Sequence, residues 1–375
     1  MKTLSDIPVL NGVKVLLRAD FNVPIKNGKV ADEFRLKSAL PTIEFLKSKG
    51  AKVILISHLE VKDGEDATLE PVGAELNKLG LPVTFIKNMA NAYSAAESMQ
   101  NGSCILLENL RDNPGEKEND QKFAKELASL ADIYVNDAFP VCHREHASIV
   151  SVPKYLPSYA GLQLEKEVQN LSKCFNPAHP FLFILCGAKF DTKLPLVKKF
   201  SGIADTVFIG GALANDLFKT KGYEVGTSLV SDELPKIDSP KLLLPADITN
   251  QNKELKSPDS LSKDDCIMDA GPKTVEELKE KIDSAEFILW NGTLGVYEKG
   301  YKEPTLAVAR LIGQATRASN GKVISIVGGG DTVAAIAELD AFEQFTFVST
   351  AGGAMLDFLA NETLPGIEAL ENSTI

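Results

Sequence analysis

Residues 323–332 read VISIVGGGDT, a run of mostly apolar residues that ends in three glycines, an aspartate and a threonine. An apolar run of this kind before a glycine loop is typical of a buried parallel strand. The same pattern recurs where Phe181–Leu185 precedes CGAK, Thr206–Ile209 precedes GGA, Phe287–Trp290 precedes NGTLG, and Phe345–Ser349 precedes TAGGA. The repetition predicts a parallel, doubly wound α/β sheet.

The glycine loops also predict a phosphate-binding edge of that sheet. The loops GGA, GGGDT and TAGGA each lead directly into a helical stretch. Glycine lets backbone N–H groups approach a phosphate at a helix N-terminus, although a tight strand-to-helix turn also needs glycine for steric reasons alone. Because the carboxyl ends of parallel strands share one edge, several such loops on one sheet favour a nucleotide site.

The first part of the chain predicts a second sheet of the same kind. Strands are expected at Val13–Ala19, Lys52–Ser57, Cys104–Glu108 and Ile133–Asn136, with helices at Leu36–Ser48, Glu70–Leu79 and Lys122–Leu130 between them. The 375 residues exceed the ~250–300 at which one hydrophobic core stops growing. We therefore predict two Rossmann-like domains, 1–160 and 161–360, joined by an interdomain helix and hinge at Leu162–Phe175.

Composition narrows the classes of partner. A net charge of −11 repels a nucleic-acid backbone or an anionic membrane surface, so neither is expected as a partner. The five cysteines form no CxxC pair, which favours a reduced, cytoplasmic protein without disulfides or thiolate zinc. No run approaches the ~18 apolar residues of a membrane span. An anion site must then be a local cluster of cations inside an acidic shell.

Such a cluster is predicted in the first domain. Cationic and polar residues follow its strands, namely Asp20, Asn22, Arg35, His58, Arg111 and the run His143-Arg144-Glu145-His146. A single arginine in this position is most often paired with a carboxylate on a solvated face. Three arginines at the strand ends of one sheet favour a carboxylate or phosphate site, because the guanidinium fork matches those groups. We assign no proton-transfer role to His143 or His146.

The second domain offers fewer charged candidates. Lys189 and Lys193 flank the glycine-containing loop after a strand, and Asp331 follows three glycines. Asp331 could be a helix N-cap or a Mg²⁺ ligand beside nucleotide phosphates. Glu298 could accept a hydrogen bond from a ribose hydroxyl, or it could simply be exposed. The chain has no GxxxxGK[ST], GxGxxG or HRD/DFG motif, which excludes the commonest nucleotide folds.

In their order along the chain, these segments resemble the phosphoglycerate kinase family nearly from end to end. The matching stretches are RADFNVP (18–24), LLENLR (106–111), YVNDAFPVCHREHAS (134–148), GAKFDTK (187–193), DAGPKT (269–274), WNGTLGVYE (290–298), GGGDT (328–332), STAGGA (349–354) and LPGIEAL (364–370). Each is short, but so many in one order are specific.

The resemblance implies a reversible, Mg²⁺-dependent transfer between 1,3-bisphosphoglycerate with ADP and 3-phosphoglycerate with ATP, in glycolysis and gluconeogenesis. It implies that phosphoglycerate is held by Asp20, Phe21, Asn22, Arg35, His58, Arg111 and Arg144. The nucleotide would be held by Lys193, Glu298, Gly329, Gly330, Asp331 and Thr332, with Asp331 also on the metal. Arg35 and Lys189 would neutralise the phosphoryl group in transit, assisted by the amides of Gly330 and Gly353. A monomer whose residues 361–375 fold back onto the first domain is expected.

This chemistry needs no general base. The carboxylate that leaves, or that attacks in the reverse direction, is already ionised at neutral pH. Positioning and charge neutralisation are sufficient for a loose, metaphosphate-like transition state. Because an acyl phosphate hydrolyses easily, closure of the two domains around the substrates is expected.

One segment departs from the family pattern. The family's S-H-L-G-R-P is Ser57-His58-Leu59-Glu60-Val61-Lys62 in this chain, so that Val61 replaces an arginine and Glu60 adds a negative charge beside the expected phosphate site. Loss of one charge-assisted hydrogen bond costs about 1.5–3 kcal/mol. We expect catalysis to persist with a raised KM for phosphoglycerate.

Two rival functions remain open on the sequence alone. The altered segment after His58 motivates a degenerated kinase, kept as a binding or regulatory protein, although Arg35, Lys189, Lys193 and Asp331 are all retained. A two-domain dehydrogenase would share the layer architecture only, and the missing GxGxxG motif argues against it.

Overall fold

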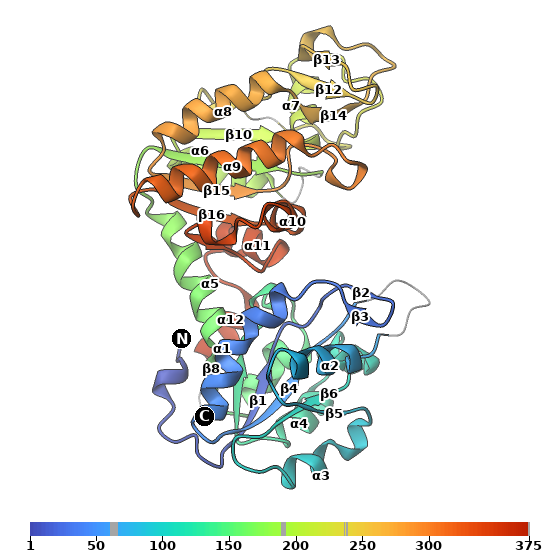
Figure 1. The fold of residues 1–375 in the computed structure, drawn as a ribbon, viewed down its shortest axis with the longest axis vertical. Coiled ribbons are helices and arrows are strands. Elements are labelled where there is room, and N and C mark those ends of the chain that lie inside the picture. The colour runs from blue at the N-terminus through green and yellow to red at the C-terminus, as the bar shows by residue number, and fades with distance from the viewer. Residues whose placement is uncertain (61–66, 189–192, 236, 238, 374–375) are drawn as a thin grey trace. The chain divides into compact units, whose positions relative to one another are not determined.

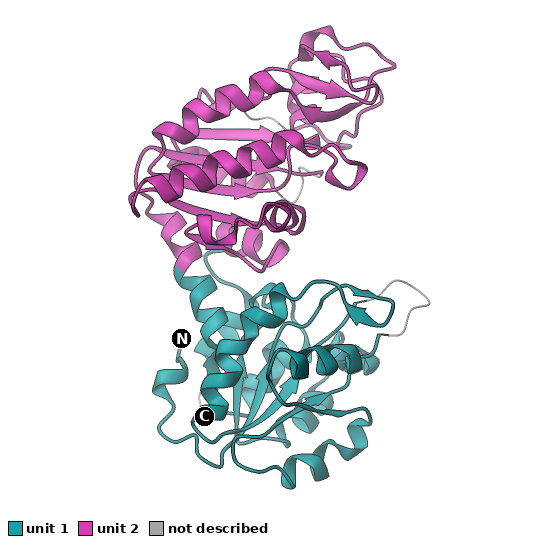
Figure 2. Ribbon diagram, in the orientation of Figure 1, with its two compact units in different colours: residues 1–169, 361–375 teal, residues 170–360 magenta. Residues whose placement is uncertain are grey.

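The computed structural model describes residues 1–60, 67–188, 193–235, 237 and 239–373 (Figure 1). The chain divides into two compact units, one of residues 1–169 with 361–375 and one of residues 170–360 (Figure 2). Each unit contains a six-stranded sheet whose strands all pair in parallel. The predicted fold class, two doubly wound parallel sheets, is confirmed.

The sheet of the first unit has the strand order β5 (Thr84–Ile86), β6 (Cys104–Leu107), β4 (Lys52–Ile56), β1 (Lys14–Arg18), β7 (Ile133–Asn136) and β8 (Ser158–Ala160). Its helices are α1 (Phe34–Ser48), α2 (Glu70–Lys78), α3 (Ala92–Glu97) and α4 (Gln121–Ala128), and β2 (Ile25–Lys26) pairs with β3 (Lys29–Val30) as a short hairpin. The central strands are buried at nearly every position, which explains their continuously apolar sequences.

The order in which successive strands are added to the sheet reverses at β1. The strand β4 pairs with one edge of β1, and β7 pairs with the other. Ligands of open α/β sheets bind outside the carboxyl ends of strands at such a switch point. The loops that follow β1, β4, β6 and β7 are therefore the expected walls of a site in this unit.

Both ends of the described chain lie in the first unit (Figure 1). The helix α12 (Pro365–Glu371) contacts the segment Ala147–Ser151 and β8. A Cβ atom added at Gly366 would lie 2.8 Å from Ile149 Cγ2, so the helix packs too closely there for a side chain. The terminal ammonium of Met1 lies 3.5 Å from the carboxylate of Glu371.

The sheet of the second unit has the strand order β11 (Leu242–Leu243), β10 (Thr206–Gly210), β9 (Phe181–Cys186), β15 (Phe287–Asn291), β16 (Ile324–Gly328) and β17 (Phe347–Val348). Its helices are α6 (Leu194–Ile203), α7 (Ala212–Thr220), α8 (Pro272–Ser284), α9 (Glu303–Ala318), α10 (Gly330–Glu338) and α11 (Gly353–Asn361). The predicted succession of strand, glycine loop and helix is confirmed at α7, α10 and α11.

A small antiparallel sheet in the second unit was not expected from the sequence. It has the order β13 (Leu255–Lys256), β12 (Ile248–Asn250) and β14 (Ile267–Ala270). Ile248 packs with Phe218 and Leu261 in a separate small apolar cluster. Strands of two to four residues carry too few alternations for a periodicity to be visible.

The helix α5 (Leu162–Ser172) crosses from one unit to the other and is followed by a 3₁₀ turn at Lys173–Phe175. The predicted helix at Leu162–Phe175 is therefore present, with its last turn tightened. Its first turn is capped by the buried Asp137, whose Oδ1 accepts hydrogen bonds from the backbone N–H groups of Gln163 (2.8 Å) and Leu164 (3.1 Å). Burial raises the pKa of Asp137 to about 7.

Replacing Asp137 by asparagine should make the stability of the chain less sensitive to pH. The folded pKa of about 7 lies above the unfolded value near 3.8, so stability from the neutral carboxyl is present below the unfolded pKa and is lost as pH rises through 7. An asparagine side chain at this position keeps an oxygen that accepts the two backbone hydrogen bonds, and it remains neutral at all of these pH values. In urea titrations, the stability advantage of Asp137→Asn should widen between pH 4 and pH 8. A constant difference for Asp137→Asn would contradict the buried, titrating cap.

Candidate active site

The loops after four parallel strands gather a cluster of charged side chains in the first unit. Arg35 Nη1 lies 3.0 Å from Asp20 Oδ2 and donates to the carbonyl oxygen of Asn22 (2.9 Å). The Asn22 Oδ1 atom accepts a hydrogen bond from the backbone N–H of Glu60 (2.9 Å). The Glu60 carboxylate reaches the guanidinium groups of Arg111 and Arg144. Hydrogen bonds and ion pairs thus connect the loop after β1 to the helix α1 and to the loop after β4. The loop after β4 is in turn paired with Arg111 and Arg144.

His58 follows β4 and is buried against Arg18. Arg18 Nη2 lies 3.0 Å from His58 Nδ1, and because a guanidinium only donates, Nδ1 is the acceptor. Burial, and then the positive charges of Arg18 and Arg111, lower the pKa of His58 well below its ordinary value. The neutral ring therefore carries its proton on Nε2, a buried atom with no hydrogen-bond partner among the described residues. An anion at this edge would find a preformed neutral donor.

Arg18 is a member of the cluster that sequence reasoning missed. It is the last residue of β1 and only 1% exposed. Its Nε donates to Ser148 Oγ (3.1 Å), and the Ser148 hydroxyl donates to the buried Glu116 (2.6 Å). The sequence does contain a signal for Arg18, since an arginine that ends a buried apolar strand must be paired inside the protein. The predicted substrate residue Phe21 is fully buried, and its backbone N–H donates to Ser57 Oγ (2.9 Å).

The second unit contains a hollow of about 520 Å³ at the carboxyl ends of its strands. Its lining includes Gly187 after β9, Gly211 after β10, Glu298 after β15 and Asp331 in α10. The structure thus brings Glu298 and Asp331 to one cavity. Asp269 also lines it, and burial raises the pKa of this carboxyl to about 8. Asp269 was not predicted as a site residue.

Asp331 is not a helix N-cap. The N-cap of α10 is Gly329, at φ +107°, and Asp331 lies within the first turn. Its side chain is exposed and forms no hydrogen bond or ion pair with any residue that the structure describes. The N-capping interpretation of this aspartate is wrong, because the helix begins one residue before it.

Lys193 and the glycine loops are held by close backbone contacts. Lys193 Nζ donates to the carbonyl oxygen of Cys186 (3.0 Å), and burial lowers the pKa of Lys193. A Cβ atom added at Gly187 would lie 1.8 Å from that Nζ, and Gly187 has φ +147°. Only glycine fits there without displacing the lysine. The predicted residue Lys189 lies outside the described residues, as do Val61 and Lys62.

The N-termini of α10 and α11 are neighbours. A Cβ atom at Gly352 would lie 3.8 Å from Gly329 Cα and 3.9 Å from Gly330 N, and α11 begins at Gly353. Two helix N-termini side by side present a concentrated set of backbone N–H groups. Thr332 is fully buried and its hydroxyl accepts a hydrogen bond from the Gly292 N–H (2.9 Å), so it holds the β15 loop against α10.

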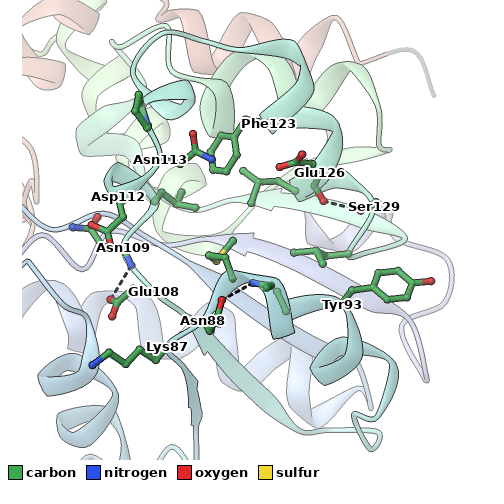
Figure 3. A pocket seen from close by; sticks show the side chains of 17 residues that line it. Lys87, Asn88, Tyr93, Glu108, Asn109, Asp112, Asn113, Phe123, Glu126 and Ser129 are labelled. Carbon is green, nitrogen blue, oxygen red and sulfur yellow. Dashed lines mark hydrogen bonds between the residues drawn. The ribbon is translucent and has the colours of Figure 1, made fainter.

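A larger hollow of about 1000 Å³ lies elsewhere in the first unit (Figure 3). Its lining includes Tyr93, Leu110, Asp112, Phe123 and Glu126, shown as sticks in the figure. None of the predicted phosphoglycerate-binding residues is among the described residues that line it. The charged cluster, rather than this hollow, is therefore the candidate site of this unit.

Two doubly wound units, one with a buried arginine and histidine cluster and one with a glycine-loop cavity, define a two-domain α/β phosphotransferase. The family model described as phosphoglycerate kinase matches residues 4–362. The chain belongs to the phosphoglycerate kinase family.

Individual relatives agree with this assignment. The chain is 41% identical to a phosphoglycerate kinase of Dictyoglomus turgidum, over 99% of both chains, and 39% identical to one of Caulobacter vibrioides, over 98% of both. Among solved structures, it is similar to phosphoglycerate kinase from Coxiella burnetii (TM-score 0.81, 33% identity, 98% of both chains covered). It is also similar to the enzyme from Pyrococcus horikoshii OT3 (TM-score 0.86, 30% identity, 100% and 99% covered).

The chain is therefore a kinase of glycolysis that transfers a phosphoryl group to a carboxyl-group acceptor. It interconverts 1,3-bisphosphoglycerate and ADP with 3-phosphoglycerate and ATP. Across the described part of the chain, no helix is long and apolar enough to cross a membrane.

Proposed function

We propose that the charged cluster of the first unit is the phosphoglycerate site of this kinase. The observation that carries the proposal is the buried His58 Nε2, which lacks a hydrogen-bond partner among the described residues and lies in a network with Arg18. Arg111, whose side chain is only 6% exposed, and the half-exposed Arg144 add two guanidinium forks. A phosphate or carboxylate group would satisfy these donors together.

The cavity of the second unit is the proposed nucleotide site. Glu298 would accept a hydrogen bond from a ribose hydroxyl, and Lys193 would contact the phosphates. The backbone N–H groups at Gly329 and Gly330, with those at Gly352 and Gly353, would bind phosphate oxygens at two helix N-termini.

The residues present fit a Mg²⁺ ion shared with the nucleotide. Magnesium is typically bound by one or two carboxylates and completes its shell with water and substrate phosphates. No group of three or more His, Cys, Asp or Glu side chains within the described ranges could hold a metal by itself. Asp331 offers a single exposed carboxylate at the cavity, as that scheme requires. When bound, Mg²⁺ would neutralise charge on the nucleotide phosphates.

The transfer step would depend on the remaining cations. Arg35 and Lys189 would bind the equatorial oxygens of the phosphoryl group, while His58, Arg111 and Arg144 hold the rest of phosphoglycerate. No proton is moved, because the reacting carboxylate is ionised and His58 is held neutral. Since an acyl phosphate hydrolyses readily, hinge bending about α5 would exclude water during the cycle.

We further propose that the chain works as a monomer in the cytoplasm. All five cysteines are free in the structure, and four of them are buried, which suits a reducing compartment. The net charge of −11 opposes self-association and anionic partners.

Titration calorimetry with each substrate tests the division of labour. Arg144→Ala should weaken 3-phosphoglycerate binding about 10- to 100-fold, because one charge-assisted hydrogen bond is worth about 1.5–3 kcal/mol, and should leave MgADP binding unchanged. Glu298→Gln should weaken MgADP binding and leave 3-phosphoglycerate binding unchanged. Equal losses for both ligands in either variant, or no loss at all, would count against the assignment.

A further inference from the structure

We infer that Glu60 is a built-in competitor of phosphoglycerate, a carboxylate of the protein itself that occupies the arginine pair Arg111 and Arg144. The inference rests on the proposed function for the role of these two arginines. It adds a residue that sets their affinity for substrate. It also gives the raised KM expected from the sequence a second cause, separate from the missing arginine at Val61.

One oxygen of Glu60 bridges two guanidinium groups. Glu60 Oε1 contacts Nη1 of Arg111 and lies 3.3 Å from Nη1 of Arg144. The backbone N–H of Glu60 is fixed by its hydrogen bond to Asn22 Oδ1, another residue of the same cluster. The carboxylate therefore lies where a substrate anion would need to bind.

The pair differs from an ordinary surface salt bridge because of burial. The Arg111 side chain is 6% exposed, whereas Glu60 is 49% exposed and covers it from the solvent side. Exposed ion pairs contribute about 0–1 kcal/mol, but a buried guanidinium without a counter-ion is strongly unfavourable. In the absence of substrate, Glu60 supplies that counter-ion. A phosphate or carboxylate of the substrate can take its place only by displacing it.

Glu60 stays ionised at neutral pH. Burial alone would raise its pKa, but the hydrogen bonds and charges of Arg111 and Arg144 outweigh burial and lower it. A tethered anion acts at an effective concentration in the millimolar range. The substrate must compete with that concentration at each encounter, so the apparent affinity for phosphoglycerate falls while the transfer step is unaffected.

The test is the Glu60→Gln variant in steady-state assays of 3-phosphoglycerate phosphorylation at physiological ionic strength. We expect the KM for 3-phosphoglycerate to fall about tenfold, with kcat and the KM for MgATP nearly unchanged. The inhibition constant of inorganic sulfate, a probe of the same arginines, should fall in parallel. Glu60→Asp, which keeps the charge on a side chain one methylene shorter, should give an intermediate KM.

A matched control removes the same charge elsewhere in the unit. Glu97 pairs with Lys14 at the amino end of β1, at the opposite edge of the sheet from Arg18. Glu97→Gln should leave the KM for 3-phosphoglycerate unchanged, because long-range charge effects are screened beyond about 8 Å at 0.15 M salt. Equal falls in Glu97→Gln and Glu60→Gln would reduce the effect to net charge and overturn the inference.

Arg111→Lys separates this inference from the proposed function. Suppose that Glu60→Gln leaves the KM for 3-phosphoglycerate unchanged or raises it, while Arg111→Lys raises it. The competitor role of Glu60 is then wrong, and the assignment of the phosphoglycerate site stands. If Arg111→Lys also has no effect, the site assignment itself fails. A lower KM for Glu60→Gln together with a higher KM for Arg111→Lys supports both.

Discussion

Replacing Arg35 by alanine should lower kcat by about 10³-fold or more, which is the effect typical of removing an arginine that stabilises a phosphoryl group in transit. Arg35 lies at the start of α1, held by Asp20 and by the carbonyl oxygen of Asn22. Its side chain is 30% exposed at the edge where the proposed substrate binds. The KM for nucleotide should change little, because the proposed nucleotide site belongs to the other unit. Steady-state kinetics in both directions measure this split.

Two variants control for effects other than lost charge neutralisation. Lys37→Ala removes an exposed cation from the same helix, where it pairs with Glu33, and should leave kcat unchanged. Arg35→Lys keeps the charge without the planar fork and should recover only part of the rate. Because Asp20 is only 7% exposed and loses its ion pair in Arg35→Ala, the thermal unfolding midpoint should be measured alongside. A folded Arg35→Ala protein with wild-type kcat would exclude Arg35 from the transfer step.

The Asp331→Asn substitution should lower kcat/KM for the magnesium nucleotide by about 10²- to 10³-fold. This is the typical effect of losing one electrostatic contact in a phosphoryl-transfer site. The Asp331 carboxylate is exposed at the cavity and has no ion-pair partner within the described chain, so its removal does not unbalance the fold. Asparagine preserves shape and removes only the charge. The apparent affinity for Mg²⁺, titrated at fixed ADP, should fall with it.

Asp340→Asn provides the matched control. Asp340 is exposed just beyond the same helix, at φ +50°, a conformation that asparagine also tolerates. Its activity and Mg²⁺ dependence should equal those of the wild type. If Asp331→Asn behaved like Asp340→Asn, the metal role of Asp331 would be lost, and the nucleotide charge would have to be neutralised by other residues.

The sequence allowed the two sheets to be predicted because each central strand is buried on both faces. Runs such as VILI (53–56) in β4 and FLFILC (181–186) in β9 are apolar throughout, and the helices between the strands have visible periodicity. The antiparallel sheet of β12, β13 and β14 could not be predicted in the same way. Its strands are short, and polar contacts around Asp265 hold the neighbouring loop.

The site was less predictable than the fold. Motifs located Arg35, His58, Arg111 and Arg144, but they did not indicate that Glu60 would bridge two of these arginines. The pairing of long side chains depends on how separate loops meet in space, and a linear pattern does not contain that information. With Asp331 as N-cap, α10 would begin at Thr332. It begins two residues earlier, at Gly330, because Gly329 at positive φ supplies the N-cap.

The most direct test is a coupled assay of ATP formation from 1,3-bisphosphoglycerate and ADP, in which the rate is measured as a function of the Mg²⁺ concentration. The retained cluster around Arg35 and the cavity at Asp331 predict Mg²⁺-dependent turnover. In the reverse direction, the KM for 3-phosphoglycerate should be higher than in relatives with glycine and arginine at positions 60 and 61. A folded protein that binds both substrates but forms no ATP would contradict it, and would mark the chain as a binding or regulatory member of the family.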